Sequence, residues 1–85
     1  MGRLAKLPNI GVVVERQLND VDIFTYEDLA KIGAEDSWLR IQSIDSSACI
    51  HRLLALEGAI RNIKKSALPE DRKAELRAFY MAHKR

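Results

Sequence analysis

The chain has 85 residues, of which 47% are hydrophobic and 31% charged, and its formal net charge is +2. This length and composition predict one folded domain over residues 1–85 and exclude an intrinsically disordered chain. No apolar run approaches the ~20 residues that span a membrane, and no apolar segment typical of a signal peptide follows Met1. Because the single cysteine, Cys49, excludes an internal disulfide, we expect a cytoplasmic protein.

The first element is a tight turn at residues 7–11, followed by a helix over residues 10–19. Pro8 cannot continue a preceding helix, Asn9 tolerates left-handed backbone, and Gly11 allows a close approach. The turn would leave free backbone N–H groups at a helix start, where an anion can bind. This pattern is typical of a helix-hairpin-helix element, which holds nucleic-acid phosphates. An ordinary structural turn explains the same residues equally simply.

The basic side chains are concentrated in the half of the chain that does not contain this turn. Residues 1–45 contain five basic and eight acidic side chains, whereas residues 46–85 contain nine basic and four acidic ones. Because phosphate neutralisation dominates DNA affinity, we expect duplex binding at the turn to be weak. The residues that would contact nucleic acid there are Arg3, Lys6, Asn9, Gly11 and Arg16.

The next helix has the best-defined start in the chain. Thr25 is a favourable N-cap, and Asp28 lies at the capping-box position. Phe24 and Leu29 have the spacing of a hydrophobic staple, and Gly33 is the expected left-handed terminator. A further helix begins directly after this glycine.

The longest helix is expected over residues 48–65, where apolar residues repeat at spacings of three and four. Ile50 and Leu54 extend the apolar surface of this helix around more of its circumference than one small core can cover. They therefore predict a homodimer contact or a surface for a protein partner. Glu57 is expected to pair with the arginine four residues later on the outer side. Gly58 is unfavourable inside a helix, which indicates close packing there.

A last helix follows Pro69. Its cations extend a basic run that starts on the preceding helix. The members of this run are Arg61, Lys64, Lys65, Arg72, Lys73 and Arg77. Two interpretations stand: a solvated rim on two helices, or a basic surface for nucleic acid or an acidic protein.

No motif indicates catalysis. His51 and His83 belong to no metal-ligand spacing, and Cys49 is two positions from His51, so the two side chains leave the helix on different sides. Phosphate-loop and dinucleotide-binding patterns are absent from the sequence. We expect no enzyme, metal, cofactor or small-molecule substrate.

No strand pattern occurs, so the predicted fold is all-α, a small bundle of five to six short helices with a helix-hairpin-helix-like N-terminal half. The predicted core consists of Val14, Leu18, Leu29, Trp38, Ile41, Leu53, Leu56, Ile60, Leu76 and Phe79.

The order of these segments resembles the C-terminal domain of the TfoX/Sxy proteins. The resemblance rests on Leu-Pro-Asn-Ile-Gly at residues 7–11, Ile-Phe-Thr-Tyr-Glu-Asp-Leu at residues 23–29 and Leu-Leu-Ala-Leu-Glu-Gly-Ala-Ile at residues 53–60. It covers residues 4–79. It implies an all-α domain with a helix-hairpin-helix-like element and no assigned catalytic residues. It also implies regulation of natural competence in bacteria, where TfoX proteins act with a global transcription activator.

The chain departs from the family in two ways. Full-length members also have an N-terminal α/β domain, so this chain is either a free-standing relative or part of a longer protein. A helix-hairpin-helix turn usually carries two glycines, whereas Asn9 stands at the first position here, where its side chain would crowd a phosphate. We therefore predict a regulatory or adaptor domain that acts through protein contacts, with the transcription machinery or a second copy as partner. Weak, non-specific DNA binding is the alternative.

Overall fold

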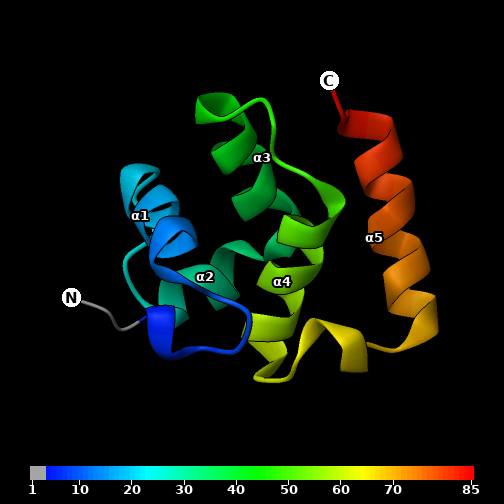
Figure 1. The fold of residues 1–85 in the computed structure, drawn as a ribbon, viewed down its shortest axis with the longest axis horizontal. Coiled ribbons are helices and arrows are strands. Elements are labelled where there is room, and N and C mark those ends of the chain that lie inside the picture. The colour runs from blue at the N-terminus through cyan, green and yellow to red at the C-terminus, as the bar shows by residue number, and fades with distance from the viewer. Residues whose placement is uncertain (1–3) are drawn as a thin grey trace.

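The computed structural model describes residues 4–85 and contains no strand in that part of the chain. Its elements are the 3₁₀ helix η1 (Leu4–Lys6), α1 (Val12–Asp20), α2 (Tyr26–Ile32), α3 (Ala34–Ile44), α4 (Ile50–Arg61), the 3₁₀ helix η2 (Lys65–Ala67) and α5 (Glu70–His83). The predicted all-α fold is confirmed. The helices α3 and α5 pack beside α4, which lies in the middle of the molecule (Figure 1).

Local signals explain both ends of α2. The Thr25 hydroxyl accepts a hydrogen bond from the Asp28 N–H (3.0 Å), and Gly33 ends the helix with a φ of +90°. The Asp28 carboxylate accepts a hydrogen bond from the Phe24 N–H (3.2 Å). In a standard capping box the donor would be the N–H of the N-cap residue, Thr25, which is one position later. Phe24 is 54% exposed, so a staple with Leu29 leaves much of its ring in water.

The central helix is shorter than the predicted range of residues 48–65. It has 12 residues and ends at Arg61, so α5, with 14 residues, is the longest helix of the described chain. Asn62 adopts the left-handed conformation (φ 59°), and the Ile63 N–H donates to the Gly58 carbonyl (2.9 Å). These features close the helix, because a left-handed residue cannot continue it.

The core contains most of the residues that periodicity predicts. Seven of them have no exposed surface, namely Leu18, Leu29, Trp38, Ile41, Leu53, Leu56 and Leu76. The other three, Val14, Ile60 and Phe79, are half-buried and pack against this cluster. The buried hydrophobic residues outside the prediction are Leu4, Ile10, Ile23, Ala34, Ala48, Ala55, Ala59 and Leu68. Many of these lie in turns or 3₁₀ helices, where a helical repeat carries no signal.

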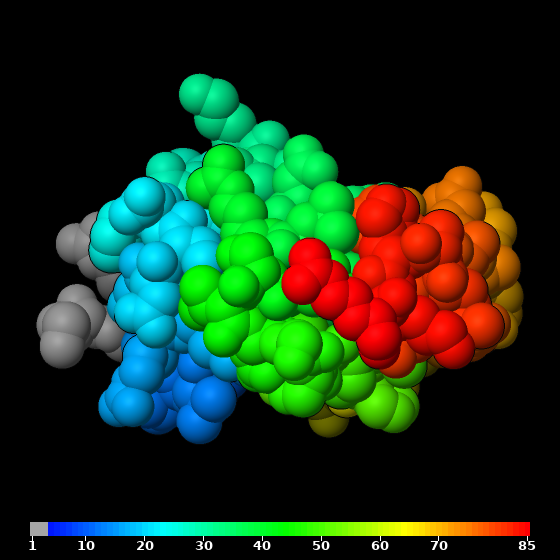
Figure 2. All heavy atoms as spheres, turned by 90° about the horizontal axis from the view of Figure 1, so that it is seen from above, coloured from blue at the N-terminus to red at the C-terminus, as the bar shows by residue number. Residues whose placement is uncertain are grey.

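The last helix is held by aromatic contacts with α3. The Trp38 ring meets Phe79 and Tyr80 edge-on, at centroid distances of 6.2 and 5.8 Å. The Trp38 indole N–H donates to the Cys49 carbonyl (3.1 Å). Seen from above, α5 forms one end of the molecule and α1 lies toward the other (Figure 2).

Candidate functional site

The turn at residues 7–11 is built around Asn9, which adopts the predicted left-handed conformation with a φ of +71°. Its side-chain N–H group donates to the Ile63 carbonyl (3.0 Å) and the Ala55 carbonyl (3.5 Å), and its oxygen accepts from the Lys65 N–H (3.0 Å). The amide therefore ties the turn to the end of α4. The Asn9 amide is therefore engaged inside the fold, whereas the crowding of a phosphate by its side chain stays a prediction.

The start of α1 has no side-chain cap. Gly11 is its N-cap residue with a φ of −98°, and a Cβ atom placed there would meet nothing within 4 Å. Within the described chain, this glycine is therefore not required by a close approach. Val12 and Val13 follow in the first turn and are 69% and 67% exposed. Because a helix start leaves its first N–H groups without partners inside the helix, this turn is the part of the predicted hairpin where an anion can bind.

Glu15 does not block that helix start. One of its carboxylate oxygens accepts hydrogen bonds from the Leu4 N–H (3.0 Å) and the Ala5 N–H (3.2 Å), so it holds η1. Lys6 and Arg16 are exposed and form no ion pair within residues 4–85. Arg3, the other predicted cation of this turn, lies outside the described residues.

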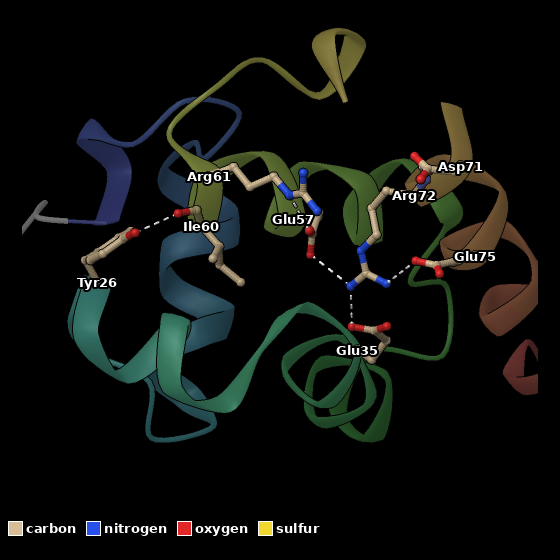
Figure 3. Close-up of polar contacts among 8 residues, drawn as sticks. All are labelled: Tyr26, Glu35, Glu57, Ile60, Arg61, Asp71, Arg72 and Glu75. Carbon is tan, nitrogen blue, oxygen red and sulfur yellow. Dashed lines mark hydrogen bonds and ion pairs between the residues drawn. The ribbon is translucent and has the colours of Figure 1, made fainter. Parts of the chain in front are cut away.

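A cluster of ion pairs centres on Arg72 of α5 (Figure 3). Its guanidinium donates to the carboxylates of Glu57 (3.1 Å), Glu35 (2.9 Å) and Glu75 (3.2 Å). The other Glu57 oxygen accepts from Arg61 at 2.7 Å. Arg72 therefore connects α3, α4 and α5, a role that no local pattern in the sequence predicts.

Glu57 lies inside this cluster with only 8% of its side chain exposed, so its predicted position on the outer side is wrong. Burial raises its pKa, but the hydrogen bonds and positive charges of Arg72 and Arg61 outweigh this, and the pKa of Glu57 falls below its usual value. The hydrogen bonds to Glu57 and Glu35 raise the pKa of Arg72. These groups are therefore charged at neutral pH.

The predicted basic run does not form one uniform positive surface. Arg61 and Arg72 pair with the acidic groups just described, and Lys73 donates to the Glu70 carboxylate and the Ser66 carbonyl, both at 3.2 Å. The members without an ion pair inside residues 4–85 are Lys64, Lys65 and Arg77. Half of the predicted cations thus have their charge balanced within the fold.

Ile50 and Leu54, the predicted partner contacts, are half-buried and pack against the core. The fold covers part of the apolar surface that motivated the prediction, and a contact through these two residues stays a prediction.

The groups considered for chemistry are dispersed. His51 is exposed, whereas His83 stacks on Phe79 with a centroid distance of 4.0 Å. Among residues 4–85, no three His, Cys, Asp or Glu side chains gather as a metal site would require.

No helix in the same range has the length and apolarity needed to cross a bilayer.

These features define a class: a small all-helical domain with a helix-hairpin-helix-like turn, stabilised by a hydrophobic core and by the ion-pair cluster around Arg72. The chain belongs to the TfoX C-terminal domain family, whose model matches residues 1–80. This confirms the resemblance inferred from the sequence. The family is of the regulator type and is not a known enzyme family.

A curated relative and two solved structures are similar over most of this chain. Protein Sxy of Escherichia coli (strain K12) is 39% identical over 74 residues, covering 87% of this chain but 35% of Sxy. The chain thus spans about a third of the length of that relative. An uncharacterized protein from Listeria monocytogenes, in a triclinic crystal form, superposes with a TM-score of 0.92 at 40% identity over 96% of this chain and 97% of that chain. A protein of unknown function from the same organism, in a tetragonal crystal form, superposes with a TM-score of 0.89 at 41% identity. The match covers 92% of this chain and 96% of that chain.

Proposed function

We propose that this chain is a non-enzymatic regulatory or adaptor domain of bacterial competence control, which acts in the cytoplasm through protein–protein contacts. Family membership and the similarity to Sxy support the regulatory part. The partner would belong to the transcription machinery or be a second copy of the chain.

The internal pairing of the basic run supports protein contacts over nucleic acid. Arg61, Arg72 and Lys73 already interact with carboxylates of the same chain. A phosphate backbone would have to compete with these carboxylates, and affinity for DNA depends on the number of phosphates neutralised. The remaining exposed cations near the turn, Lys6 and Arg16, supply too few contacts for strong binding at physiological salt.

DNA binding through the turn is the second candidate, favoured by the uncapped start of α1. Its exposed N–H groups lie between Lys6 and Arg16 in the sequence. We expect affinity for duplex DNA no tighter than the non-specific range of about 10⁻⁴–10⁻⁶ M at physiological salt. Fluorescence anisotropy across a salt series measures this directly. Sub-micromolar binding that is lost in Lys6→Glu/Arg16→Glu would make the turn a DNA-binding site and refute the protein-contact proposal.

A chimaera tests the regulatory role itself. In E. coli cells that lack Sxy, this chain would replace the matching segment of Sxy, and a competence-gene reporter would be read. We expect the chimaera to restore reporter expression, and we expect Lys6→Glu/Arg16→Glu in the chimaera to leave that expression unchanged. A folded chimaera with no reporter activity would contradict the regulatory assignment, while activity lost only in the double variant would favour DNA contact.

A further inference from the structure

The last helix contributes little to the core for its length. Leu76 is the one buried residue among the 14 of α5, whereas six of the 12 residues of α4 are buried. Phe79 and Tyr80 are half-buried against Trp38. The helix forms one end of the molecule and is joined to the other helices through its start alone (Figures 1 and 2). A terminal helix with few buried apolar residues can open locally while the rest of the fold stays intact.

The chain before α5 provides a defined point for such an opening. Leu68 is buried, and its N–H donates to the Lys65 carbonyl (3.3 Å). The Lys65 N–H is in turn held by the Asn9 side chain (3.0 Å). Pro69 follows, is exposed and has no N–H to bond. The helix can therefore turn about the bond between Leu68 and Pro69 without disturbing the end of α4.

The contacts of α5 with α3 follow one stripe along α3. Glu35, Trp38 and Gln42 recur at spacings of three and four, so they share a face of that helix. Glu35 accepts from Arg72 (2.9 Å), Trp38 meets the two aromatic rings of α5, and the Gln42 side-chain N–H donates to the His83 carbonyl (2.8 Å). The stripe thus presents a carboxylate, an apolar ring and an amide donor, in this order.

The ion pairs of α5 are exchangeable. When α5 leaves, the Arg72 guanidinium and the Glu35 and Glu57 carboxylates regain the hydration that burial costs them, which offsets much of the lost attraction. Glu57 also keeps a partner, because Arg61 contacts it at 2.7 Å and lies on the same helix. The ion pairs therefore select which helix docks here more than they hold it in place.

We propose that α5 is an intrachain cover, which opens as a unit about the bond between Leu68 and Pro69 and uncovers this α3–α4 face for a basic amphipathic helix of a partner protein. This inference rests on the proposed function and names the surface through which its protein contacts are made. The partner helix carries an arginine, a leucine four residues later, and aromatic residues seven and eight residues later. This is the pattern of α5 itself, at Arg72, Leu76, Phe79 and Tyr80. The Glu35 and Glu57 carboxylates select the arginine by charge complementarity.

Native-state hydrogen exchange, followed by NMR for each amide, tests the opening. In the wild type, the amides of α5 are expected to be at least about tenfold less protected than those of α4, because only α4 must wait for the whole fold to open. Residues 74–80 should share one protection factor. Fraying would instead give a gradient that falls toward the C-terminus.

Two substitutions separate local from global opening. Arg72→Gln weakens the closed state against both the open and the unfolded states, so the protection of α5 and of α4 should fall by the same factor, at least about tenfold. Ile23→Val thins the core between α1 and α2, away from α5 (Figure 1). It should lower the protection of α4 by a factor of about 2–10 and leave that of α5 unchanged.

Arg77→Gln is the matched control for Arg72→Gln. It removes the same charge from the same helix at an exposed position that has no ion pair within residues 4–85. The protection of both helices should stay as in the wild type.

A labelled peptide of residues 69–85 probes the uncovered face by fluorescence anisotropy. Its affinity should be at least about tenfold higher for the Arg72→Gln chain than for the wild type, because apparent affinity follows the fraction of open molecules. A peptide with Arg72→Gln should bind more weakly than the unchanged peptide. A peptide with Arg77→Gln should bind as the unchanged peptide does.

Equal protection of α4 and α5 in the wild type would overturn the opening, and so would a gradient of fraying. An open α5 without saturable peptide binding to the Arg72→Gln chain at millimolar peptide would overturn the docking face. These measurements use the purified chain, whereas the chimaera tests the proposed function in cells, so either can fail without the other.

Discussion

Replacing Leu56 by alanine is expected to lower the free energy of unfolding by about 2–5 kcal/mol. Leu56 has no exposed surface and lies on α4, the helix that the other elements surround. The substitution removes buried methyl groups and leaves a cavity that the neighbouring side chains fill only in part. Because small domains are stable by only about 5–15 kcal/mol, the loss is a large share of the total. Denaturant melts measure it.

Leu54→Ala is the matched control on the same helix. Leu54 is half-buried, so its truncation creates less cavity and costs less than the same change at Leu56. A loss below about 1 kcal/mol for Leu56→Ala would show that Leu56 is not in a packed core.

Gly58→Ala is expected to destabilise the fold by about 1–3 kcal/mol, although alanine is the better helix former by about 1 kcal/mol. A Cβ atom at this position would lie 2.5 Å from the Asn9 side-chain nitrogen, 2.8 Å from the Ile63 carbonyl oxygen and 3.2 Å from the Lys65 nitrogen. Two of these are backbone atoms, so the chain that follows α4 must move. The clash therefore outweighs the gain in helix propensity.

Gly11→Ala provides the comparison for this experiment. Gly11 has an ordinary backbone conformation, and an added Cβ atom would meet nothing within 4 Å. We expect this variant to lose less stability than Gly58→Ala, because alanine is a poorer N-cap than glycine but meets no clash here and reduces the freedom of the unfolded chain. Equal stability of Gly58→Ala and Gly11→Ala would contradict the close contact between the turn and α4.

Local patterns predicted the parts of the fold that depend on neighbours in the sequence. The cap at Thr25 and the terminator at Gly33 follow from the chemistry of single residues, and both occur in the structure. The helical repeat likewise identified the buried faces of α3 and α4. The family was recognisable because these segments occur in a characteristic order.

The ion-pair cluster could not be predicted in this way. Arg72 meets Glu57 and Glu35, which lie 15 and 37 residues earlier in the chain. No periodicity connects such distant positions, so the arginine could only be read as one more surface cation. Of the candidate basic run, Arg61, Arg72 and Lys73 are paired inside the fold. The early end of α4 was missed for another reason: Asn62 ends the helix by its left-handed backbone, a role more often taken by glycine.

The hydrogen bonds of Asn9 also bear on the order in which the molecule folds. The groups that hold its side chain belong to Ala55, Ile63 and Lys65, which lie 46, 54 and 56 positions later in the chain. A segment that ends before Ala55 contains the whole sequence of the hairpin but none of the hydrogen bonds that the Asn9 side chain makes with α4 and the chain after it. We expect these hydrogen bonds to form late in folding, after α4 and the chain beyond it, because so distant a contact must first overcome the entropy of closing the intervening loop.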